Sequence, residues 1–445
     1  PPGPPPLPLI GNLLQLGRGP IHSLTELRKK YGPVFTLYLG PRPVVVVTGP
    51  EAVKEVLIDK GEEFAGRGDF PVFPWLGYGI LFSNGPRWRQ LRRLLTLRFF
   101  GMGKRSKLEE RIQEEARDLV ERLRKEQGSP IDITELLAPA PLNVICSLLF
   151  GVRFDYEDPE FLKLIDKLNE LFFLVSPWGQ LLDFFRYLPG SHRKAFKAAK
   201  DLKDYLDKLI EERRETLEPG DPRDFLDSLL IEAKREGGSE LTDEELKATV
   251  LDLLFAGTDT TSSTLSWALY LLAKHPEVQA KLREEIDEVI GRDRSPTYDD
   301  RANMPYLDAV IKETLRLHPV VPLLLPRVAT EDTEIDGYLI PKGTLVIVNL
   351  YSLHRDPKVF PNPEEFDPER FLDENGKFKK SYAFLPFGAG PRNCLGERLA
   401  RMELFLFLAT LLQRFELELV PPGDIPLTPK PLGLPSKPPL YQLRA

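Results

Sequence analysis

Cys394 is the residue whose surroundings most clearly indicate chemistry in this sequence. It is one of two cysteines and lies in a glycine-rich loop, FGAGPRNCLG, at residues 387–396. Gly388, Gly390 and Gly396 let the backbone take positive φ angles and approach a flat partner closely. The apolar segment after Gly396 predicts a helix whose N-terminus points at the cysteine, and such an end favours a thiolate over a thiol. A thiolate that faces a close-packed plane is what an axial ligand of haem iron requires.

Other interpretations of this loop fit less well. The loop contains neither GxxxxGK[ST] nor GxGxxG, so it does not predict a phosphate cradle. A catalytic Cys–His pair would need a histidine from elsewhere in the chain, and the sequence leaves that possibility open. A buried, inert thiol is the usual state of a lone cysteine and suits Cys146 in LNVICSLLFG, whereas the surroundings of Cys394 are polar and rich in glycine.

A charged pair in DAVIKETLRLHP is a second candidate. Glu313 and Arg316 are three residues apart, so they are neighbours on a helix. Such a pair could be a solvated surface contact, which is common on a highly charged protein. However, Glu313 shares one helical stripe with Tyr306, Val310 and Leu317, so its carboxylate lies on an otherwise apolar face and needs a buried partner.

A third candidate interrupts the apolar run LLFAGTDTTSSTLSWALYLL. Residues 257–261, Gly-Thr-Asp-Thr-Thr, are mediocre helix formers and can divert hydrogen bonds from the backbone. They either ease the packing of the helix or serve a function.

The bulk composition limits the class of protein. The 445 residues contain no Gly/Ser-rich linker, low-complexity tract or internal repeat, so one large unit is expected. The net charge of −7 argues against nucleic-acid binding, and the basic segment 87–107, with eight basic residues and no acidic one, lacks an interleaved aromatic platform. The five histidines are too scattered for a local metal motif, and no run of 18 apolar residues predicts a bilayer span.

The elements that must position these residues are mostly helical. β-rich runs occur at 34–40, 44–48 and 334–349, and the last contains an Asp336-Gly337 turn signal. The pattern is neither a βαβ alternation nor a sandwich, so we expect a mainly α fold with a small β portion. Helices are expected at 104–127, 192–217, 242–274 (after the capping box Thr242-x-x-Glu245), 303–318 and 396–415.

The cysteine loop resembles the haem-ligand signature of the cytochrome P-450 superfamily, FxxGxRxCxG. The fixed positions are matched by Phe387, Gly390, Arg392, Cys394 and Gly396. The resemblance covers essentially the whole chain, and FGMGKRS, RFDYEDPEF and YLPGSH are most similar to the microsomal, xenobiotic-oxidising family-two branch. Three further family motifs match in order: WxxxR at Trp88 and Arg92, AGTDTT at 256–261, and ExxR at Glu313 and Arg316, with Arg370 as its usual third member.

This resemblance implies a fold and a reaction. The fold is the cytochrome P-450 fold, a large helical domain with a small β-rich lobe, formed by residues 1–445 as a single catalytic domain whose residues 1–10 are a proline-rich hinge. The cofactor is haem b. The reaction inserts one oxygen atom of dioxygen into a lipophilic small molecule, with electrons from NADPH supplied through a reductase. A haem-thiolate isomerase, a peroxide-dependent oxygenase and a non-catalytic haem sensor are the alternatives.

The resemblance also implies partners and a location. NADPH-cytochrome reductase is the expected electron donor, with cytochrome b5 as a second candidate, and the rest of the basic segment 87–107 would dock such an acidic partner. The expected location is the cytosolic face of the endoplasmic reticulum membrane. The chain as given would be a soluble form without the N-terminal membrane anchor of a full-length protein.

Individual residues receive roles from the same resemblance. Asp259 and Thr260 hold and relay protons for oxygen activation, and Glu313, Arg316 and Arg370 form a structural triad. Cys394 is the iron ligand, and the other residues expected beside the cofactor are Trp88, Arg92, Ala256, Arg327, Phe387, Gly388, Arg392 and Gly396. The expected substrate contacts are Ile80, Leu81, Phe82, Phe255, Ala256, Val320, Val321, Leu323, Leu324, Gly433 and Leu434.

Two residues depart from the pattern of the branch. Arg327 stands where a histidine is usual, which should preserve a positive contact to a haem propionate. Leu76 stands where an arginine is expected, so one such contact should be lost. The acidic net charge is also unusual for that branch, and the chain is similar to a family average, as a consensus or reconstructed sequence would be.

Overall fold

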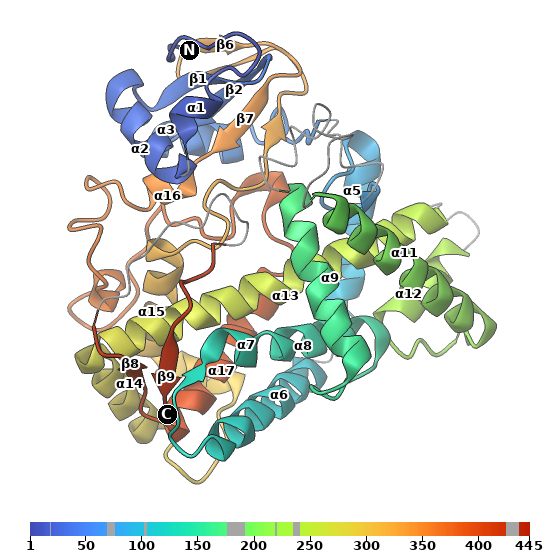
Figure 1. Ribbon diagram of the computed structural model, residues 1–445, viewed down its shortest axis with the longest axis vertical. Helices are drawn as coiled ribbons and strands as arrows, with labels where there is room; N and C mark the ends of the chain where they lie inside the picture. Colours follow the sequence, from blue (N-terminus) through green and yellow to red (C-terminus); the bar gives the residue numbers. More distant parts are fainter. Residues whose placement is uncertain are drawn as a thin grey trace.

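A long helix, α13 (Asp243–Lys274), crosses the middle of the molecule (Figure 1). It begins with the predicted capping box, in which the Thr242 hydroxyl accepts the N–H of Glu245 and the Glu245 carboxylate accepts the N–H of Thr242. Helices α8, α15 and α17 pack against it, so side chains on every face of α13 are buried. The computed structural model describes residues 1–17, 19–68, 76–101, 105–175, 192–218, 220–234, 241–423 and 436–445.

The predicted helices are confirmed, with small shifts at their ends. They are α6 (Arg105–Lys125), α11 (His192–Glu215), α13, α15 (Pro305–Leu317) and α17 (Glu397–Arg414). Sequence analysis missed α8 (Pro139–Phe150), in which 10 of 12 residues are buried, because a helix that is apolar on every side shows no stripe of period 3.6. It also missed α14 (Pro276–Val289), although a proline at the first helical position is a recognised start signal.

The β portion forms a lobe beside the helices (Figure 1). Its four-stranded sheet has the order β1 (Val34–Leu39), β2 (Arg42–Val47), β7 (Leu345–Val348) and β4 (Arg327–Val328). Strands β1 and β2 are antiparallel, β2 and β7 are parallel, and β7 and β4 are antiparallel. The predicted Asp336-Gly337 turn joins β5 (Thr333–Ile335) to β6 (Tyr338–Ile340), with φ angles of +50° and +76°.

Residues 1–10 lie against this sheet. Thr36 on β1 donates its N–H to the Pro2 carbonyl at 2.7 Å and its hydroxyl to the Pro1 carbonyl at 3.1 Å. A Cβ added at Gly3 would lie 1.9 Å from the Thr36 carbonyl oxygen, so this close approach requires glycine. The proline-rich segment is therefore held along β1 in this structure.

The remaining elements complete the helical domain and its edges. The segment Ile133–Phe150 is long and apolar enough to span a membrane by length and composition, but 67% of it is buried, as in a core helix. A small sheet joins β3 (Ile131–Asp132), β9 (Gln442–Arg444) and β8 (Glu418–Val420). The other elements are α1 (Leu13–Leu16), α2 (Pro20–Tyr31), α3 (Pro50–Lys54), η1 (Glu55–Asp59), α5 (Gly85–Gly101), α7 (Ile133–Leu137), α9 (Pro159–Val175), α12 (Phe225–Ala233), η3 (Tyr298–Asn303), α16 (Leu350–Leu353), η4 (Pro368–Phe371) and η5 (Gly390–Arg392).

Candidate active site

A cavity lies between α13, the cysteine loop and the start of α17. Its wall also includes residues of the segments 80–92 and 319–327, which are far apart in sequence. The structure thus brings most of the predicted site residues to one place. Those that line the cavity are Ile80, Leu81, Trp88, Arg92, Ala256, Thr260, Val320, Val321, Leu324, Arg327, Phe387, Gly388, Arg392, Cys394 and Gly396.

Several predicted contacts do not line this cavity. Phe82 is buried in the main hydrophobic core and Phe255 packs against it, whereas Leu323 belongs to the core of the β lobe. Their expected contact with substrate stays a prediction. Which core each side chain joins depends on tertiary packing, and no short motif encodes it. Gly433 and Leu434 lie outside the described residues.

The cysteine loop is shaped by its glycines. Gly388 and Gly390 both have φ angles of +70°, and a Cβ on Gly390 would lie 1.7 Å from the Leu57 carbonyl oxygen. The N–H of Cys394 donates to the Phe387 carbonyl at 2.9 Å, which closes the loop. Gly396 precedes α17 with φ −85°, and a Cβ there would meet no atom within 4 Å. The loop therefore leaves open space beside the sulfur, as a flat ligand needs.

The Cys394 thiol has a raised pKa in the protein alone. Burial raises it, and the Glu397 charge adds to this, while the N–H groups of Gly396 and Glu397 and the Arg92 guanidinium lower it. The N–H groups at the start of α17 favour the thiolate as expected, but loss of solvation outweighs them in the protein alone. A metal cation on the sulfur would reverse this balance, because a coordinating thiol is deprotonated outright.

Three arginines form a buried cationic cluster at the cavity wall. Arg67, Arg327 and Arg392 are 6%, 2% and 8% exposed, and within the described ranges none lies within ion-pair distance of a carboxylate. Arg67 donates to the Leu81, Leu325 and Pro326 carbonyls, and Arg392 to the Ala65 and Ser83 carbonyls. The Nε of Arg327 is buried without a partner among the described residues. We call these three residues the arginine cluster.

The pKa values of the arginine cluster show that it lacks a counter-charge. Burial lowers the pKa of Arg327 to about 10. Burial, together with the charges of Arg327 and Arg92, lowers the pKa of Arg392 to about 9. Burial and the other two guanidinium groups lower the pKa of Arg67. Isolated buried cations are costly, so this donor set fits a ligand that carries anionic groups, such as haem with its two propionates.

Arg67 was not predicted from the sequence. It occurs in FAGRGDF, where no motif or helical stripe marks it, and only the fold places it beside residues 327 and 392. Leu76, where the resemblance implies an arginine, is a buried core residue, whereas Arg67 lines the cavity.

Trp88 and Arg92 reach the cavity from α5. Arg92 donates to the Asn393 carbonyl at 2.8 Å and to Asn393 Oδ1 at 2.7 Å, which ties α5 to the cysteine loop. The Arg392 guanidinium lies 3.9 Å from the centre of the Trp88 ring, a cation–π distance. Trp88 and Arg92 thus both line the cavity, and their contact with the cofactor stays a prediction.

The residues 257–261 that interrupt the apolar run of α13 have two roles: they allow close helix packing and they place a hydroxyl group at the cavity wall. A Cβ at Gly257 would lie 2.6 Å from Ile145 Cδ1, so glycine allows α8 to approach closely. The Thr260 hydroxyl, which lines the cavity, donates to the Ala256 carbonyl at 2.7 Å. The predicted diversion of a hydrogen bond from the backbone is thus present.

Asp259 faces a different direction from Thr260. It is not part of the cavity wall, and its Oδ1 accepts a hydrogen bond from Lys437 Nζ at 2.7 Å. The carboxylate is 8% exposed and the lysine side chain 27%, so the lysine connects the acid to the protein surface. Lys437 also donates to Asn169 Oδ1 on α9 at 3.3 Å. No motif in the sequence marks Lys437, which lies 178 residues from Asp259.

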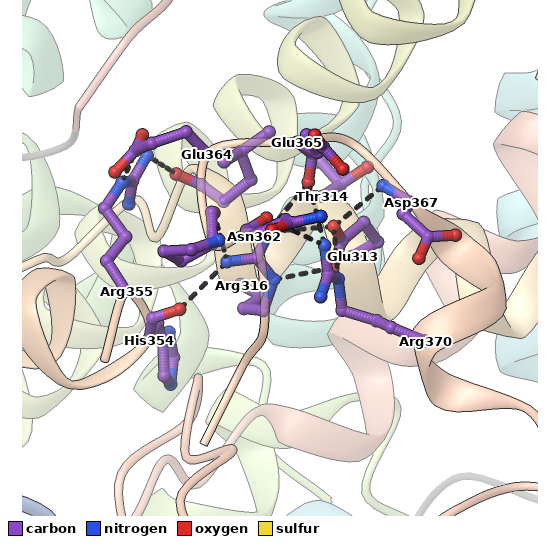
Figure 2. Close-up of polar contacts among 12 residues, drawn as sticks. Glu313, Thr314, Arg316, His354, Arg355, Asn362, Glu364, Glu365, Asp367 and Arg370 are labelled. Carbon is purple, nitrogen blue, oxygen red and sulfur yellow. Dashed lines mark hydrogen bonds and ion pairs between the residues drawn. The ribbon is translucent and has the colours of Figure 1, made fainter. Parts of the chain in front are cut away.

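The triad Glu313, Arg316 and Arg370 is present as a buried network (Figure 2). Glu313 accepts hydrogen bonds from Arg316 at 2.7 and 2.8 Å and from Arg370 at 2.9 Å. The side chains of Glu313 and Arg316 are both 0% exposed. Arg316 also donates to the His354 and Pro363 carbonyls, so it joins α15 to the segment that precedes the cysteine loop.

Comparison with known proteins agrees with these features. The family model described as Cytochrome P450 matches residues 1–445. The chain belongs to the cytochrome P450 family. It is 54% identical to Cytochrome P450 2C25 of Mesocricetus auratus, 53% to Cytochrome P450 2C16 of Oryctolagus cuniculus and 54% to Cytochrome P450 2C29 of Mus musculus. Each alignment covers 100% of this chain and 93% of the relative.

Membership confirms the class of the protein. This cytochrome P450 is a haem-dependent monooxygenase with the mainly α fold and the small sheet component expected from the sequence. The fit between the cavity and the cofactor rests on residues already described, namely a cysteine that faces open space and an arginine cluster without an anionic partner among the described residues.

Proposed function

We propose that this cytochrome P450 holds haem b through the Cys394 thiolate and inserts one atom of dioxygen into lipophilic small molecules. NADPH supplies two electrons through a reductase, and the second oxygen atom leaves as water. We propose further that residues 1–445 act as one catalytic domain. The observation that carries this proposal is a single cavity whose wall contains Cys394, Thr260 and the uncompensated arginine cluster.

Different residues of the cavity are proposed to hold different parts of the cofactor. Cys394 Sγ would hold the iron, and Trp88, Arg92 and the arginine cluster would hold the propionates. Ala256, Phe387, Gly388 and Gly396 line the same cavity and would contact the cofactor. When bound, the haem would supply the redox chemistry of dioxygen activation.

Proton delivery is assigned to α13. Thr260 presents its hydroxyl to the cavity, and Asp259 links α13 to the partly exposed ammonium group of Lys437. Because Lys437 Nζ already donates to Asp259 Oδ1, we propose that this contact breaks when Asp259 passes a proton toward Thr260. We expect Thr260→Ala to lower the product formed per NADPH consumed several-fold; unchanged coupling would contradict the role of Thr260.

The substrate region of the cavity is apolar. Ile80, Leu81, Val320, Val321 and Leu324 line it, and they exclude water from the reacting groups while giving little directional specificity. We propose that Gly433 and Leu434 add to this region.

Electron transfer is assigned to the outer side of α5. A shallow groove there is lined by Arg89, Arg92, Arg93, Thr96 and Pro391, together with Glu62, Trp88 and Leu97, next to the cysteine loop. We propose that this groove docks an acidic reductase or cytochrome b5, an attraction that salt should weaken. By analogy with the relatives, we propose that the protein works on the cytosolic face of the endoplasmic reticulum membrane.

Reconstitution tests the proposed reaction. Purified haem-loaded protein is incubated with NADPH, a reductase and a lipophilic substrate under ¹⁸O₂, and the product is analysed by mass spectrometry. One ¹⁸O atom per product molecule is expected. Turnover with peroxide but none with the reductase, or a rearranged product without added oxygen, would contradict the proposal.

A further inference from the structure

A tryptophan outside the cavity is connected to the cavity wall through one other residue. Trp267 lies on α13, about two helical turns after Thr260, and is 4% exposed. Its indole Nε1 donates to the Ser436 carbonyl at 2.9 Å, and the N–H of Ser436 donates in turn to the Val320 carbonyl at 2.8 Å. Val320 lines the cavity, whereas Trp267 does not. Ser436 thus transmits the position of the indole to the wall.

The same indole also packs on the residue that precedes this part of the wall. The rings of Trp267 and His318 are stacked, with centroids 3.6 Å apart and planes 4° from parallel. Burial and nearby cations lower the pKa of His318 well below its usual value, so the ring is neutral and packs as an apolar group. His318 leads directly into residues 319–321, which line the cavity and which we call the wall segment.

The composition of the wall segment makes this connection important. Pro319 and Pro322 have no N–H group, so they limit the hydrogen bonds that can hold the segment in place. At its far end, Tyr351 donates its N–H to the Pro322 carbonyl at 3.1 Å. At its near end, the Val320 carbonyl accepts the N–H of Ser436. The position of Val320 therefore depends on where Ser436 is held.

We infer that Trp267 is a positioning residue for the proposed reaction, which fixes Val320 through Ser436 and thereby decides which carbon of a lipophilic substrate is oxidised. This inference rests on the proposed function, since it assumes that oxidation takes place in this cavity. An apolar wall gives little directional contact, so its shape selects the reacting carbon. A displacement of about 1 Å is enough to change reactivity strongly.

Two substitutions at Trp267 separate the hydrogen bond from the packing. Trp267→Phe keeps a six-membered aromatic ring and removes the N–H donor. Trp267→His is smaller, but its Nε2 has the same place in the five-membered ring as the indole Nε1 and can donate to Ser436. A residue that only fills space would be replaced better by phenylalanine, whereas the inference predicts that histidine is the better replacement.

Tyr441→Phe is the matched control. The Tyr441 hydroxyl donates to the Ser266 carbonyl at 2.5 Å, so it also joins the C-terminal segment to α13. It has no part in the connection from Trp267 to Val320. Loss of this hydroxyl therefore removes a hydrogen bond between the same two parts of the chain and leaves the wall segment held.

The alcohols formed from n-octane provide the first measurement. The C–H bonds at carbons 2, 3 and 4 are of nearly equal strength, so the product ratio reports the shape of the cavity. Haem-loaded protein with a reductase and NADPH is assayed at pH 8, where histidine is neutral. The ratio of the major to the minor octanol should fall at least about threefold in Trp267→Phe and less than about 1.5-fold in Trp267→His and Tyr441→Phe.

Hydrogen exchange provides a second measurement that does not depend on turnover. The N–H of Ser436, followed by mass spectrometry in the haem-loaded protein, should exchange about three- to tenfold faster in Trp267→Phe. Its rate in Trp267→His should equal that of the unmodified protein.

The outcomes distinguish the inference from the proposal beneath it. An unchanged octanol ratio in Trp267→Phe, or a larger change in Trp267→His than in Trp267→Phe, would overturn the inference. A fall in Tyr441→Phe as large as that in Trp267→Phe would overturn it as well, because general loosening would then explain both. Absence of octanols from the unmodified protein would instead contradict the proposed monooxygenation, and the exchange rate of Ser436 would still decide whether Trp267 holds the wall segment.

Discussion

Two buried clusters of charged residues in this protein differ in whether the protein itself supplies a counter-charge. In the triad of Glu313, Arg316 and Arg370, the carboxylate accepts hydrogen bonds from both guanidinium groups, and the remaining N–H groups reach backbone carbonyls (Figure 2). In the arginine cluster, the structure places no carboxylate within ion-pair distance among the described residues, and carbonyl oxygens are its hydrogen-bond acceptors.

The difference separates a structural cluster from a binding cluster. A buried cation that has its anion nearby needs nothing from outside, so the triad can hold α15 against the segment before the cysteine loop. A buried cation without an anion costs free energy in the protein alone, and the cost is recovered only when an anionic ligand binds. The arginine cluster therefore marks the cofactor cavity, whereas the triad does not.

Removing the shared anion of the triad should produce the largest effect. Glu313→Gln leaves Arg316 and Arg370 buried without a counter-charge, so we expect a loss of about 3 to 5 kcal/mol in the free energy of unfolding, measured by denaturant titration. Glu26→Gln, which breaks an exposed pair with Lys29, is the control and should change nothing measurable. Equal unfolding free energies of Glu313→Gln and the unmodified protein would contradict the claim that the Glu313 carboxylate compensates the two buried arginines.

Removing a member of the arginine cluster should have the opposite sign in the haem-free chain. Arg327→Met deletes a cation that is 2% exposed and bound by hydrogen bonds of 3.4 and 3.5 Å, so the free energy of unfolding should rise by about 1 kcal/mol or more. Haem should leave the loaded variant about ten- to a hundredfold faster, as measured by transfer to a scavenging protein. Faster unfolding together with unchanged haem release would show that Arg327 is structural.

Asp252 and Asp308 allow the same comparison between an unpaired and a paired buried charge, because the stability that each contributes should depend on pH in the opposite direction. Burial raises the pKa of Asp252 to about 8, above the unfolded value near 4, so its contribution to stability is lost progressively as pH rises from about 4 to 8. For Asp308, burial is more than offset by Arg301 and Lys312, and its pKa is lowered, so its contribution is present above the unfolded pKa and is lost as pH falls through the folded value.

The corresponding asparagine variants should therefore diverge. Relative to the unmodified protein, Asp252→Asn should gain up to about 1.4 kcal/mol of unfolding free energy per pH unit between pH 5 and 8. Asp308→Asn should be destabilised at pH 7, and this loss should shrink below pH 4. Denaturant unfolding curves recorded between about pH 3 and 8 measure these differences. Parallel pH profiles of the unfolding free energy for both variants would contradict the opposite pKa shifts of Asp252 and Asp308.

An exposed arginine should show the smallest effect. Arg93 is exposed at the groove beside the cysteine loop, where water already solvates its charge. Arg93→Glu should leave the free energy of unfolding within about 0.5 kcal/mol and raise the KM for the reductase several-fold, with the difference disappearing at high salt. A reductase KM that is independent of this charge would place the docking surface elsewhere.

The parts of the site that could be predicted are those encoded by short spacing. Cys394 and its glycines occur within ten residues, and Glu313 and Arg316 are one helical turn apart, so motif and periodicity suffice to find them. Arg67 and Lys437 could not be found in this way. Arg67 reaches the Leu325 carbonyl across 258 residues and Lys437 reaches Asp259 across 178, and neither residue belongs to a local pattern.

The fold shows the same division. Helices with a capping box or a clear apolar stripe, such as α13 and α15, were predicted with nearly correct bounds. The buried helix α8 was missed because its apolar residues face all directions. Which core a side chain joins, as for Phe82 and Leu323, depends on tertiary packing that neither pattern encodes.

The carbon monoxide difference spectrum of the reduced, haem-loaded protein tests the central claim most directly. Cys394 has a raised pKa in the protein alone, so a thiolate ligand exists only if iron bound at the cavity deprotonates it. A strongly red-shifted Soret band is predicted, and Cys146→Ser should leave it unchanged because Cys146 is buried in α8. A band at the position typical of histidine-ligated haem would contradict the assignment of Cys394 thiolate as the axial ligand.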